Sequence, residues 1–230
     1  MDVIGFLAEY TGTVIHDCWC SYWSYDEEND QLRHSVCNAH ILRELNGLAK
    51  FFHNANHWAA DMSSLLREIL HAKHEAQASG MKCFGAETIA QYFRRYDELI
   101  AKGKELHPVP ERRPGQRGRL KKGRARSLID RMELRKEDIL RFLTDFDIPF
   151  DNNETERSFR LLGAKKGVGI FRTLDNAQNF CLVWSYLATA HKHKISYYDA
   201  IREALLGNSM KMIFSEEAPK STATSTDDAA

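Results

Sequence analysis

The spacing of apolar residues predicts a chain that is mostly helical, with one short strand near its start. Thr13-Val14-Ile15-His16-Asp17 has the pattern of a buried strand that ends on an acid. Two later segments repeat apolar residues at the i, i+3, i+4, i+7 spacing of an amphipathic helix. Their apolar positions are Trp58, Met62, Leu65, Leu66, Ile69 and Leu70 in the first, and Ile89, Tyr92, Phe93, Tyr96, Leu99 and Ile100 in the second.

The second half of the chain continues this helical pattern. A third helix is expected from Ser127, as its N-cap, to Phe146, and Pro149 then stops it. Asp151-Asn152-Asn153 is a helix-start signal, because short polar side chains cap free backbone N–H groups. It predicts a helix from about Asn153 to Lys165. Two further helices are expected. The first is a buried helix with apolar positions Phe180, Val183, Trp184 and Leu187. The second is short, with apolar positions Tyr198, Ile201, Leu205 and Leu206.

Composition adds one strong local feature to a balanced chain. The 230 residues hold 32 basic and 32 acidic side chains, so the formal net charge is zero. Residues 112–126, within a loop spanning 108–126, nevertheless carry eight Arg or Lys and no acid. Such a run gives non-specific affinity for nucleic-acid phosphates, although taken alone it is more typical of a solvated loop.

Other composition features bear on the compartment and on the membrane. The five cysteines are irregularly spaced, which indicates no disulfide framework and fits a reducing compartment. No apolar run approaches the ~20 residues of a membrane span, and the first residues lack the pattern of a signal peptide. We therefore expect a cytoplasmic protein with no membrane partner.

Two acidic positions are candidates for chemistry. Asp17 ends the predicted strand, where a carboxylate is rigid and faces the crevice that binds ligands in α/β sheets; the alternative is a strand-terminating acid in a turn. Glu156 lies with Arg160 on one face of the predicted helix, and the alternative there is a capped helix with a surface ion pair. Phosphoryl transfer on DNA commonly uses two divalent metals held by a few such carboxylates.

Four segments resemble the transposase family named after insertion sequence sixty-six. They occur in the family's order within residues 13–205, and together they are a specific match. The segments are His16-Asp17-Cys18-Trp19 with Tyr22; Cys37-Asn38-Ala39-His40-Ile41-Leu42-Arg43-Glu44-Leu45; Leu140-Arg141-Phe142-Leu143 through Pro149-Phe150-Asp151-Asn152-Asn153-Glu154-Thr155-Glu156-Arg157; and Lys165-Lys166-Gly167 through Phe171-Arg172.

The resemblance implies an α/β fold of the RNase H-like type with an Asp-Asp-Glu triad and a two-metal Mg²⁺ site. It assigns Asp17 to the second acid and Glu156 to the third, with Glu154 as the lesser candidate. The helices between these acids are then a large all-α insertion, which makes the chain mostly helical. The expected domains are a partial core over 1–50, the insertion over 51–146, the remaining core over 147–208 and a disordered tail over 209–230.

The family's first Asp has no counterpart here, because only Asp2 and Glu9 precede Asp17 and neither follows a strand. We expect a truncated, C-terminal portion of a transposase that cannot cut or join DNA alone. One alternative is a non-catalytic remnant that binds DNA or pairs with intact transposase. Another is an RNase H-like nuclease unrelated to transposition.

The same resemblance implies double-stranded DNA, as transposon ends and target, as the partner. It also implies self-association or pairing with intact transposase, in a bacterial cytoplasm and on the nucleoid when bound to DNA. The expected phosphate contacts are Arg119, Lys121, Lys122 and Arg124 in the basic loop, and Arg157, Arg160, Lys165, Lys166 and Arg172 around the Glu156 helix.

Two further clusters are better explained by packing. Cys37 and His40, followed by His53 and His57, resemble a zinc site with one Cys replaced. A single Cys is a poor soft-ligand set, so we expect no zinc and treat Cys37 and His40 as a structural motif. For the aromatic loop residues Trp19, Tyr22, Trp23 and Tyr25, we expect packing rather than stacking on flipped DNA bases.

Overall fold

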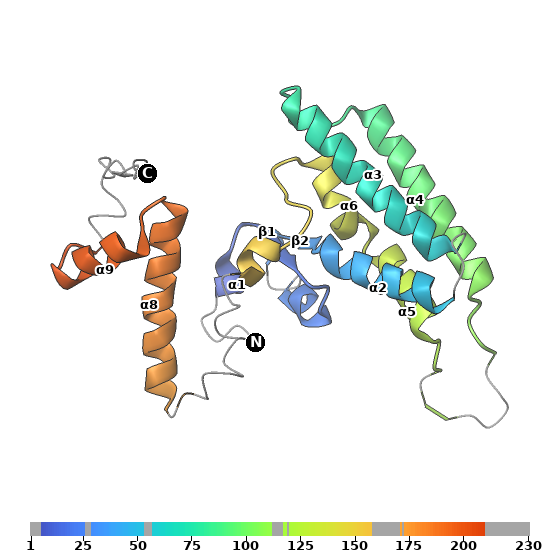
Figure 1. The fold of residues 1–230 in the computed structure, drawn as a ribbon. Helices are drawn as coiled ribbons and strands as arrows, with labels where there is room; N and C mark the ends of the chain where they lie inside the picture. Colours follow the sequence, from blue (N-terminus) through green and yellow to red (C-terminus); the bar gives the residue numbers. More distant parts are fainter. Residues whose placement is uncertain are drawn as a thin grey trace, which may run out of the picture. The chain divides into compact units, whose positions relative to one another are not determined.

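The structure, a computed structural model, describes residues 6–25, 29–52, 57–111, 117–118, 120–157, 171 and 173–209. The chain divides into two compact units, Met1–Asn153 and Glu154–Ala230. Each unit has its own cluster of buried apolar side chains, a large one in the first and a small one in the second. Figure 1 shows the elements of both.

The first unit begins with a short helix and two strands: α1 (Phe6–Glu9), β1 (Gly12–His16) and β2 (Leu32–Val36). A 3-10 helix, η1 (Cys20–Tyr25), lies in the connection between the strands. The strands form a two-stranded parallel sheet. Its register runs from Gly12 opposite Leu32 to His16 opposite Val36.

Five helices follow the sheet: α2 (Asn38–Phe51), α3 (Trp58–Ala78), α4 (Ala86–Leu106), α5 (Arg124–Leu134) and α6 (Lys136–Thr144). Each of the first four packs on the next, and α6 packs on β2. The long pair α3 and α4 runs side by side in Figure 1. The helical segment predicted from sequence therefore returns to the sheet through α6.

The core of this unit is tightest where three helices meet. A Cβ atom at Gly103 of α4 would lie 3.1 Å from side-chain atoms of both Trp58 and Ile129, which come from α3 and α5. The buried Tyr96 hydroxyl donates to the Met132 carbonyl and so ties α4 to α5 at a second point. Glycine at position 103 allows this close approach, since even a single Cβ there would require Trp58 and Ile129 to shift by a few tenths of an ångström.

The third helix expected from sequence is two helices. It begins at Arg124 after an N-cap Gly123 with φ of +80°, not at Ser127, whose hydroxyl donates to the Gly123 carbonyl. The helix breaks at Arg135, whose guanidinium lies 3.9 Å from the centroid of the Trp23 ring. The break gives α6 a direction of its own, and four of its apolar side chains are fully buried.

The strand β2 has no counterpart among the elements predicted from sequence. Its sequence, Leu-Arg-His-Ser-Val, has only two aliphatic residues, at its ends. His34 and Ser35 are nevertheless buried, and Arg141 of α6 donates a hydrogen bond to the His34 carbonyl. Tertiary contacts, rather than an apolar pattern, hold this segment in the sheet.

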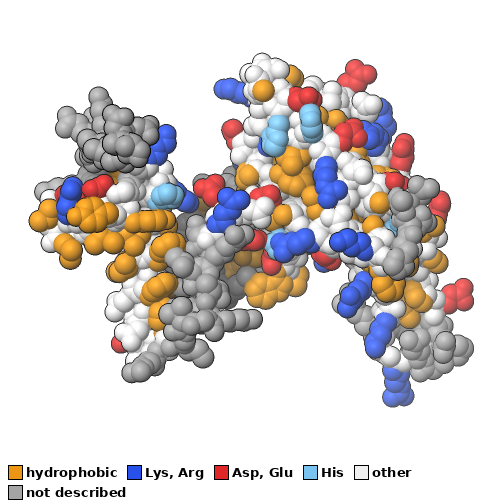
Figure 2. All heavy atoms as spheres, viewed as in Figure 1, with side chains coloured by type: hydrophobic (Ala, Val, Ile, Leu, Met, Phe, Trp, Pro, Cys, Tyr) orange, Lys and Arg blue, Asp and Glu red, His pale blue; other side chains and the backbone are white. Residues whose placement is uncertain are grey.

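The second unit contains α8 (Leu174–Lys192) and α9 (Tyr197–Leu205), near the positions expected. The expectation that the first of these helices is buried is wrong, because Leu182 and Val183 are 72% and 57% exposed. Hydrophobic side chains gather along both helices in Figure 2. The expected disordered tail lies, from residue 210 on, outside the described residues.

None of the helices in the described part of the chain combines the length and the apolar character that a bilayer span requires.

Candidate active site

Asp17 directly follows β1 and is exposed. The next residue, Cys18, has a left-handed backbone with φ of 68°, which is uncommon for a residue other than glycine. Its backbone N–H donates to Nδ1 of His16 at 3.3 Å and closes a tight turn around Asp17. The carboxylate predicted from sequence thus sits at the carboxyl end of a parallel strand, where the turn fixes its backbone.

The side chain of His16, which accepts this hydrogen bond, is buried. Because its Nδ1 accepts from Cys18, the proton is on Nε2, which donates to Nδ1 of His34 on β2 at 3.1 Å. Tyr22 stacks on the imidazole at 4.2 Å between ring centroids, and Trp23 meets it edge-on at 4.6 Å. Tyr22 and Trp23 therefore pack on the His16 ring, as the packing interpretation predicts.

The segment around residues 150–153 binds across the same end of the sheet. The Asn38 backbone N–H donates to the Phe150 carbonyl at 3.0 Å, and the Asn152 N–H donates to Sγ of Cys37 at 3.3 Å. The Asn152 side chain also donates to the carbonyl of Ile15 at 3.4 Å. Asn152 of the Asp-Asn-Asn motif therefore contacts Ile15, which lies two positions before Asp17 in the chain.

Contacts with α3 hold the chain just before this motif. The ammonium of Lys73, a buried residue, donates to the Ile148 carbonyl at 2.6 Å, and the Gln77 side chain donates to the Phe146 carbonyl. Burial lowers the pKa of Lys73 from its ordinary value, and the nearby carboxylates of Asp145 and Asp147 act in the opposite direction. Helix α3 thus holds the chain that leads into the motif.

The motif then starts a helical turn, as the sequence predicts. The Asp151 carboxylate accepts from the Asn153 N–H at 3.0 Å, and residues 153–157 are helical. Glu154 and Glu156 belong to the second unit, so the pairing of Glu156 with Asp17 stays a prediction. Arg157 is exposed on this turn.

Other phosphate contacts expected near this helix lie outside the described residues. They are Arg160, Lys165, Lys166 and Arg172.

Cys37 and His40 occupy the start of α2. Cys37 is its N-cap, fully buried, and its sulfur accepts the hydrogen bond from Asn152. His40 is in the first helical turn and is half-buried. His57 has a different partner, described next, and His53 lies outside the described residues.

A histidine pair, which the sequence analysis missed, joins the ends of α3 and α4. Nδ1 of His57, the N-cap of α3, accepts from the Ala59 N–H, so its Nε2–H donates to Nε2 of His107 at 3.0 Å. Burial lowers the pKa of both imidazoles, and repulsion from the charge of a protonated His107 lowers the pKa of His57 further. The residues are 50 positions apart, and no local pattern connects them.

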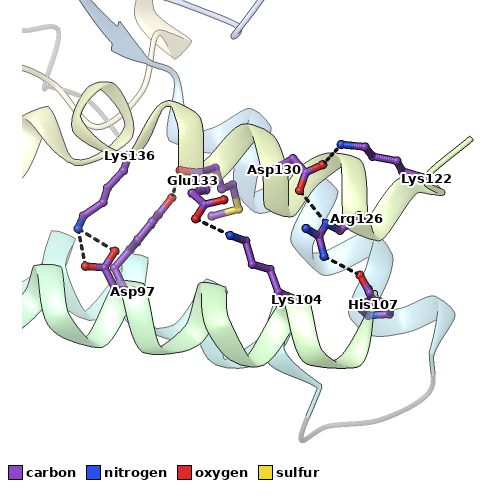
Figure 3. A network of polar contacts seen from close by, with 10 residues as sticks. Asp97, Lys104, His107, Lys122, Arg126, Asp130, Glu133 and Lys136 are labelled. Atoms are coloured by element: carbon purple, nitrogen blue, oxygen red, sulfur yellow. Dashed lines mark hydrogen bonds and ion pairs between the residues drawn. The ribbon is translucent and has the colours of Figure 1, made fainter. Parts of the chain in front are cut away.

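The basic loop is described only in part. Lys121, Lys122 and Arg124 are exposed, and Arg119 lies outside the described residues. Lys122 and Arg126 both reach Asp130, at 2.6 and 2.7 Å, as Figure 3 shows. Partial burial acts to raise the pKa of Asp130, but these two hydrogen bonds outweigh it and lower that pKa. Figure 2 shows Lys and Arg side chains along the segment that leads into α5.

Cations of α5 also lie near the Asp17 turn. Burial raises the pKa of the Cys18 thiol to about 11, while the positive charges of Arg131 and Arg135 act to lower it. A thiol with that pKa is protonated at neutral pH and is a poor nucleophile or metal ligand. Cys18 therefore serves as packing, and the two arginines place positive charge near the Cys18 side chain.

Comparison with known proteins supports the assignment made from the sequence motifs. Residues 3–179 match the Transposase IS66 family, and the matched stretch includes both candidate acids. Searches of curated proteins and of solved structures found no match. Transposases act on DNA, and this family's DDE class implies divalent metal ions as cofactors. Since the match covers well over half of its residues, the chain belongs to the IS66 family of transposases.

Proposed function

We propose that this chain carries two of the three acids of a transposase active site, Asp17 and Glu156, which together hold Mg²⁺ for DNA cleavage and strand transfer. The observation that carries the proposal is the bonding of Asn152 to the end of β1 and to Cys37. It brings Asn152, near the start of the motif that continues to Glu156, next to the strand that precedes Asp17, across a sequence separation of more than 130 residues.

The donor chemistry at Asp17 fits Mg²⁺. Its carboxylate is exposed and directly follows a strand. Mg²⁺ takes oxygen ligands, of which one or two are protein carboxylates and several are waters. Bound metals would activate the attacking oxygen and stabilise the leaving oxygen. The chain's own part is positional: His16 fixes the turn below Asp17, and Asn152 fixes the start of the motif.

The cations around the site suit a DNA backbone. Lys121, Lys122 and Arg124 are exposed on the segment before α5, and Arg131 and Arg135 lie near the Asp17 turn. Contacts of this kind position the duplex and carry no base information. Double-stranded transposon ends are therefore the proposed substrate of this surface.

We further propose that the 230-residue chain does not cut or join DNA alone. Among the described residues that precede Asp17, the carboxylate is Glu9, and it lies in α1 rather than on a strand. A third acid on a segment or chain beyond these residues would complete the triad. The same observation favours a second candidate function, a DNA-binding remnant that pairs with intact transposase.

Metal binding tests the proposal directly. Titration of the full chain with Mn²⁺, followed by calorimetry, should show binding that Asp17→Asn and Glu156→Gln each weaken about tenfold or more, because each removes a direct ligand. Glu154→Gln is the matched control, since it removes the neighbouring acid of the same helical turn, and it should bind as the unaltered chain does.

Two results would contradict this assignment. Equal binding by the Asp17→Asn variant would remove that residue from the metal site. No Mn²⁺ binding by the unaltered chain, together with tight binding of duplex DNA, would favour the remnant. Mg²⁺-dependent strand transfer by the chain alone would refute its proposed dependence on another acid.

A further inference from the structure

The first unit has a broad groove beside Phe51, called the Phe51 groove. It encloses about 1610 Å³ and is lined by three segments: the end of α2, the residues that follow α4, and the residues that lead into α5. No residue assigned above to metal binding lines it. Its lining combines apolar and cationic side chains.

Two aromatic rings stand at the α2 side of the groove. Phe51 is 74% exposed, and Phe52 is 40% exposed. Phe52 is stacked on His57 at 4.7 Å between centroids, so one of its faces is occupied. Phe51 meets Phe52 edge-on at 5.1 Å with an interplanar angle of 90°, which fixes the ring while leaving most of it in solvent. The groove therefore presents a held, exposed aromatic face.

The opposite side of the groove is positively charged. Five cations line it, and two carboxylates pair with three of them: Asp130 with Lys122 and Arg126, and Glu44 with Arg131.

Lys121 and Arg124 have no carboxylate partner among the residues that the structure describes. The paired cations hold the segment in place, as Figure 3 shows for Lys122, Arg126 and Asp130. The two others remain for a ligand with negative charge.

The groove continues to the candidate active site. A second cavity, of about 280 Å³, shares Lys122, Ser127 and Arg131 with it and extends along α5 to Cys18. Cys18 is the neighbour of Asp17 in the chain. A linear ligand in the groove can therefore reach the turn that carries the acid, over a helix length of about 12 Å from Ser127 to Arg135 at ~1.5 Å per residue.

We propose that the Phe51 groove binds single-stranded DNA, with an unpaired base stacked on Phe51 and adjacent phosphates on Lys121 and Arg124. Stacking on an exposed ring needs a free base face, which duplex DNA does not offer, and rows of aromatic and cationic residues are the usual means of binding single strands. An apolar peptide would fill the aromatic side but would leave the positive charge unmatched. The idea that the strand is an opened transposon end rests on the proposed function; the binding itself does not.

The test uses the full chain and a ~12-nucleotide single strand that contains the fluorescent base 2-aminopurine, with EDTA present. Anisotropy gives affinity, and quenching of the base reports stacking. Phe51→Ala should weaken single-strand binding about tenfold and abolish the quenching, with duplex affinity unchanged. The double variant Lys121→Ala/Arg124→Ala should lower the slope of log affinity against log salt by about 1.4, or ~0.7 per lost phosphate contact.

Matched controls lie at the α3–α4 turn. Met81 is 46% exposed and Lys82 is exposed, and neither lines the groove, so Met81→Ala and Lys82→Ala should bind as the unaltered chain does. Unchanged affinity or quenching in Phe51→Ala would overturn the proposal, as would an equal loss in Met81→Ala. A change in sedimentation from dimer to monomer in Phe51→Ala, without a change in DNA binding, would identify the groove as a contact between copies instead.

Failure here is distinguishable from failure of the proposed function. The assay contains no metal, and Asp17→Asn should leave single-strand binding intact. If Asp17→Asn lost Mn²⁺ binding while Phe51→Ala still bound single-stranded DNA as the unaltered chain does, the groove proposal alone would be refuted.

Discussion

At the scale of single residues, the hydrogen bond between His57 and His107 depends on the protonation of both imidazoles. Both imidazoles must be neutral, because Nε2 of His107 accepts the proton that Nε2 of His57 donates, and Nδ1 of His57 accepts from Ala59. Protonation of either ring places two donors face to face. The pair also supports Phe52, which stacks on His57.

This pair predicts a loss of stability in mild acid. The pKa of each imidazole is lowered in the folded chain, so the unfolded chain binds more protons, and the free energy of unfolding rises with pH. The contribution is complete above the ordinary value of 6.5 and is lost as the pH falls below it. Urea unfolding measured from about pH 8 to about pH 5 should show this decline.

Two variants distinguish the contribution of the His57–His107 pair from other causes of lower stability in acid. His57→Asn keeps a side-chain acceptor for the Ala59 N–H and removes the titrating ring, so its stability should depend less steeply on pH. His74→Asn, at an exposed position of α3, should keep the original dependence. Parallel curves for His57→Asn and the unaltered chain would show that the pair does not cause the decline.

At the scale of helices, two glycines in helical positions should respond in opposite directions to alanine. Gly103→Ala adds a Cβ 3.1 Å from Trp58 and Ile129, which are both fully buried and cannot move away cheaply. We expect a net loss of about 1 kcal/mol in the free energy of unfolding, because overpacking of 1–3 kcal/mol exceeds the ~1 kcal/mol gain in helix propensity.

Gly47→Ala in α2 is the matched substitution. Its Cβ would meet nothing within 4 Å, so only the propensity gain remains, and stability should rise by about 0.5–1 kcal/mol. Denaturant titration of both variants and of the unaltered chain gives the free energies of unfolding that check these two predictions. A stabilised Gly103→Ala would mean that α3, α4 and α5 are packed more loosely than these distances indicate.

Sequence reasoning succeeded for elements whose own residues determine them. The apolar spacing of residues 58–70 and 89–100 predicted α3 and α4, and Thr13 to His16 predicted β1. It missed β2, whose buried His34 and Ser35 are polar. It also missed the break at Arg135, because no Pro or Gly marks it and its partner, Trp23, lies more than 100 residues away.

The site was predictable to the same extent. Asp17 became a candidate because a strand and its terminal acid are local features, and the family resemblance gave it a catalytic role; the Asp-Asn-Asn helix start is local too. The bonds from Asn152 to Ile15 and Cys37 are not, since they join segments 137 and 115 residues apart. Pairing at that range depends on the whole fold, which periodicity does not encode.

At the scale of the whole molecule, stability is concentrated in the first unit. Its core contains residues from the sheet and from α2 to α6, whereas the buried core among the described residues of the second unit is Ala190, Ile195 and Ala200. Several large apolar side chains of α8 and α9 remain exposed, including Leu182 and Leu205. The two units should therefore differ greatly in how well they fold by themselves.

A shortened chain that ends at Asn153 should fold cooperatively. It retains the main core and the bonds of Asn152, so its urea midpoint should match the main transition of the full chain, with a free energy of unfolding within ~1 kcal/mol. Circular dichroism at two wavelengths and intrinsic fluorescence provide the measurement. Broad, non-coincident transitions would show that residues beyond Asn153 are needed for this core.

The contact between Asn152 and Ile15 also determines when the Asp17 turn is completed during synthesis. Its two partners are separated by 137 residues, and ribosomes add about 5–20 residues per second. The nascent strand β1 therefore waits roughly 7 to 27 seconds for the segment that covers its end. During that interval its half-buried Val14 and Ile15 are open to chaperones or to strands of other nascent chains.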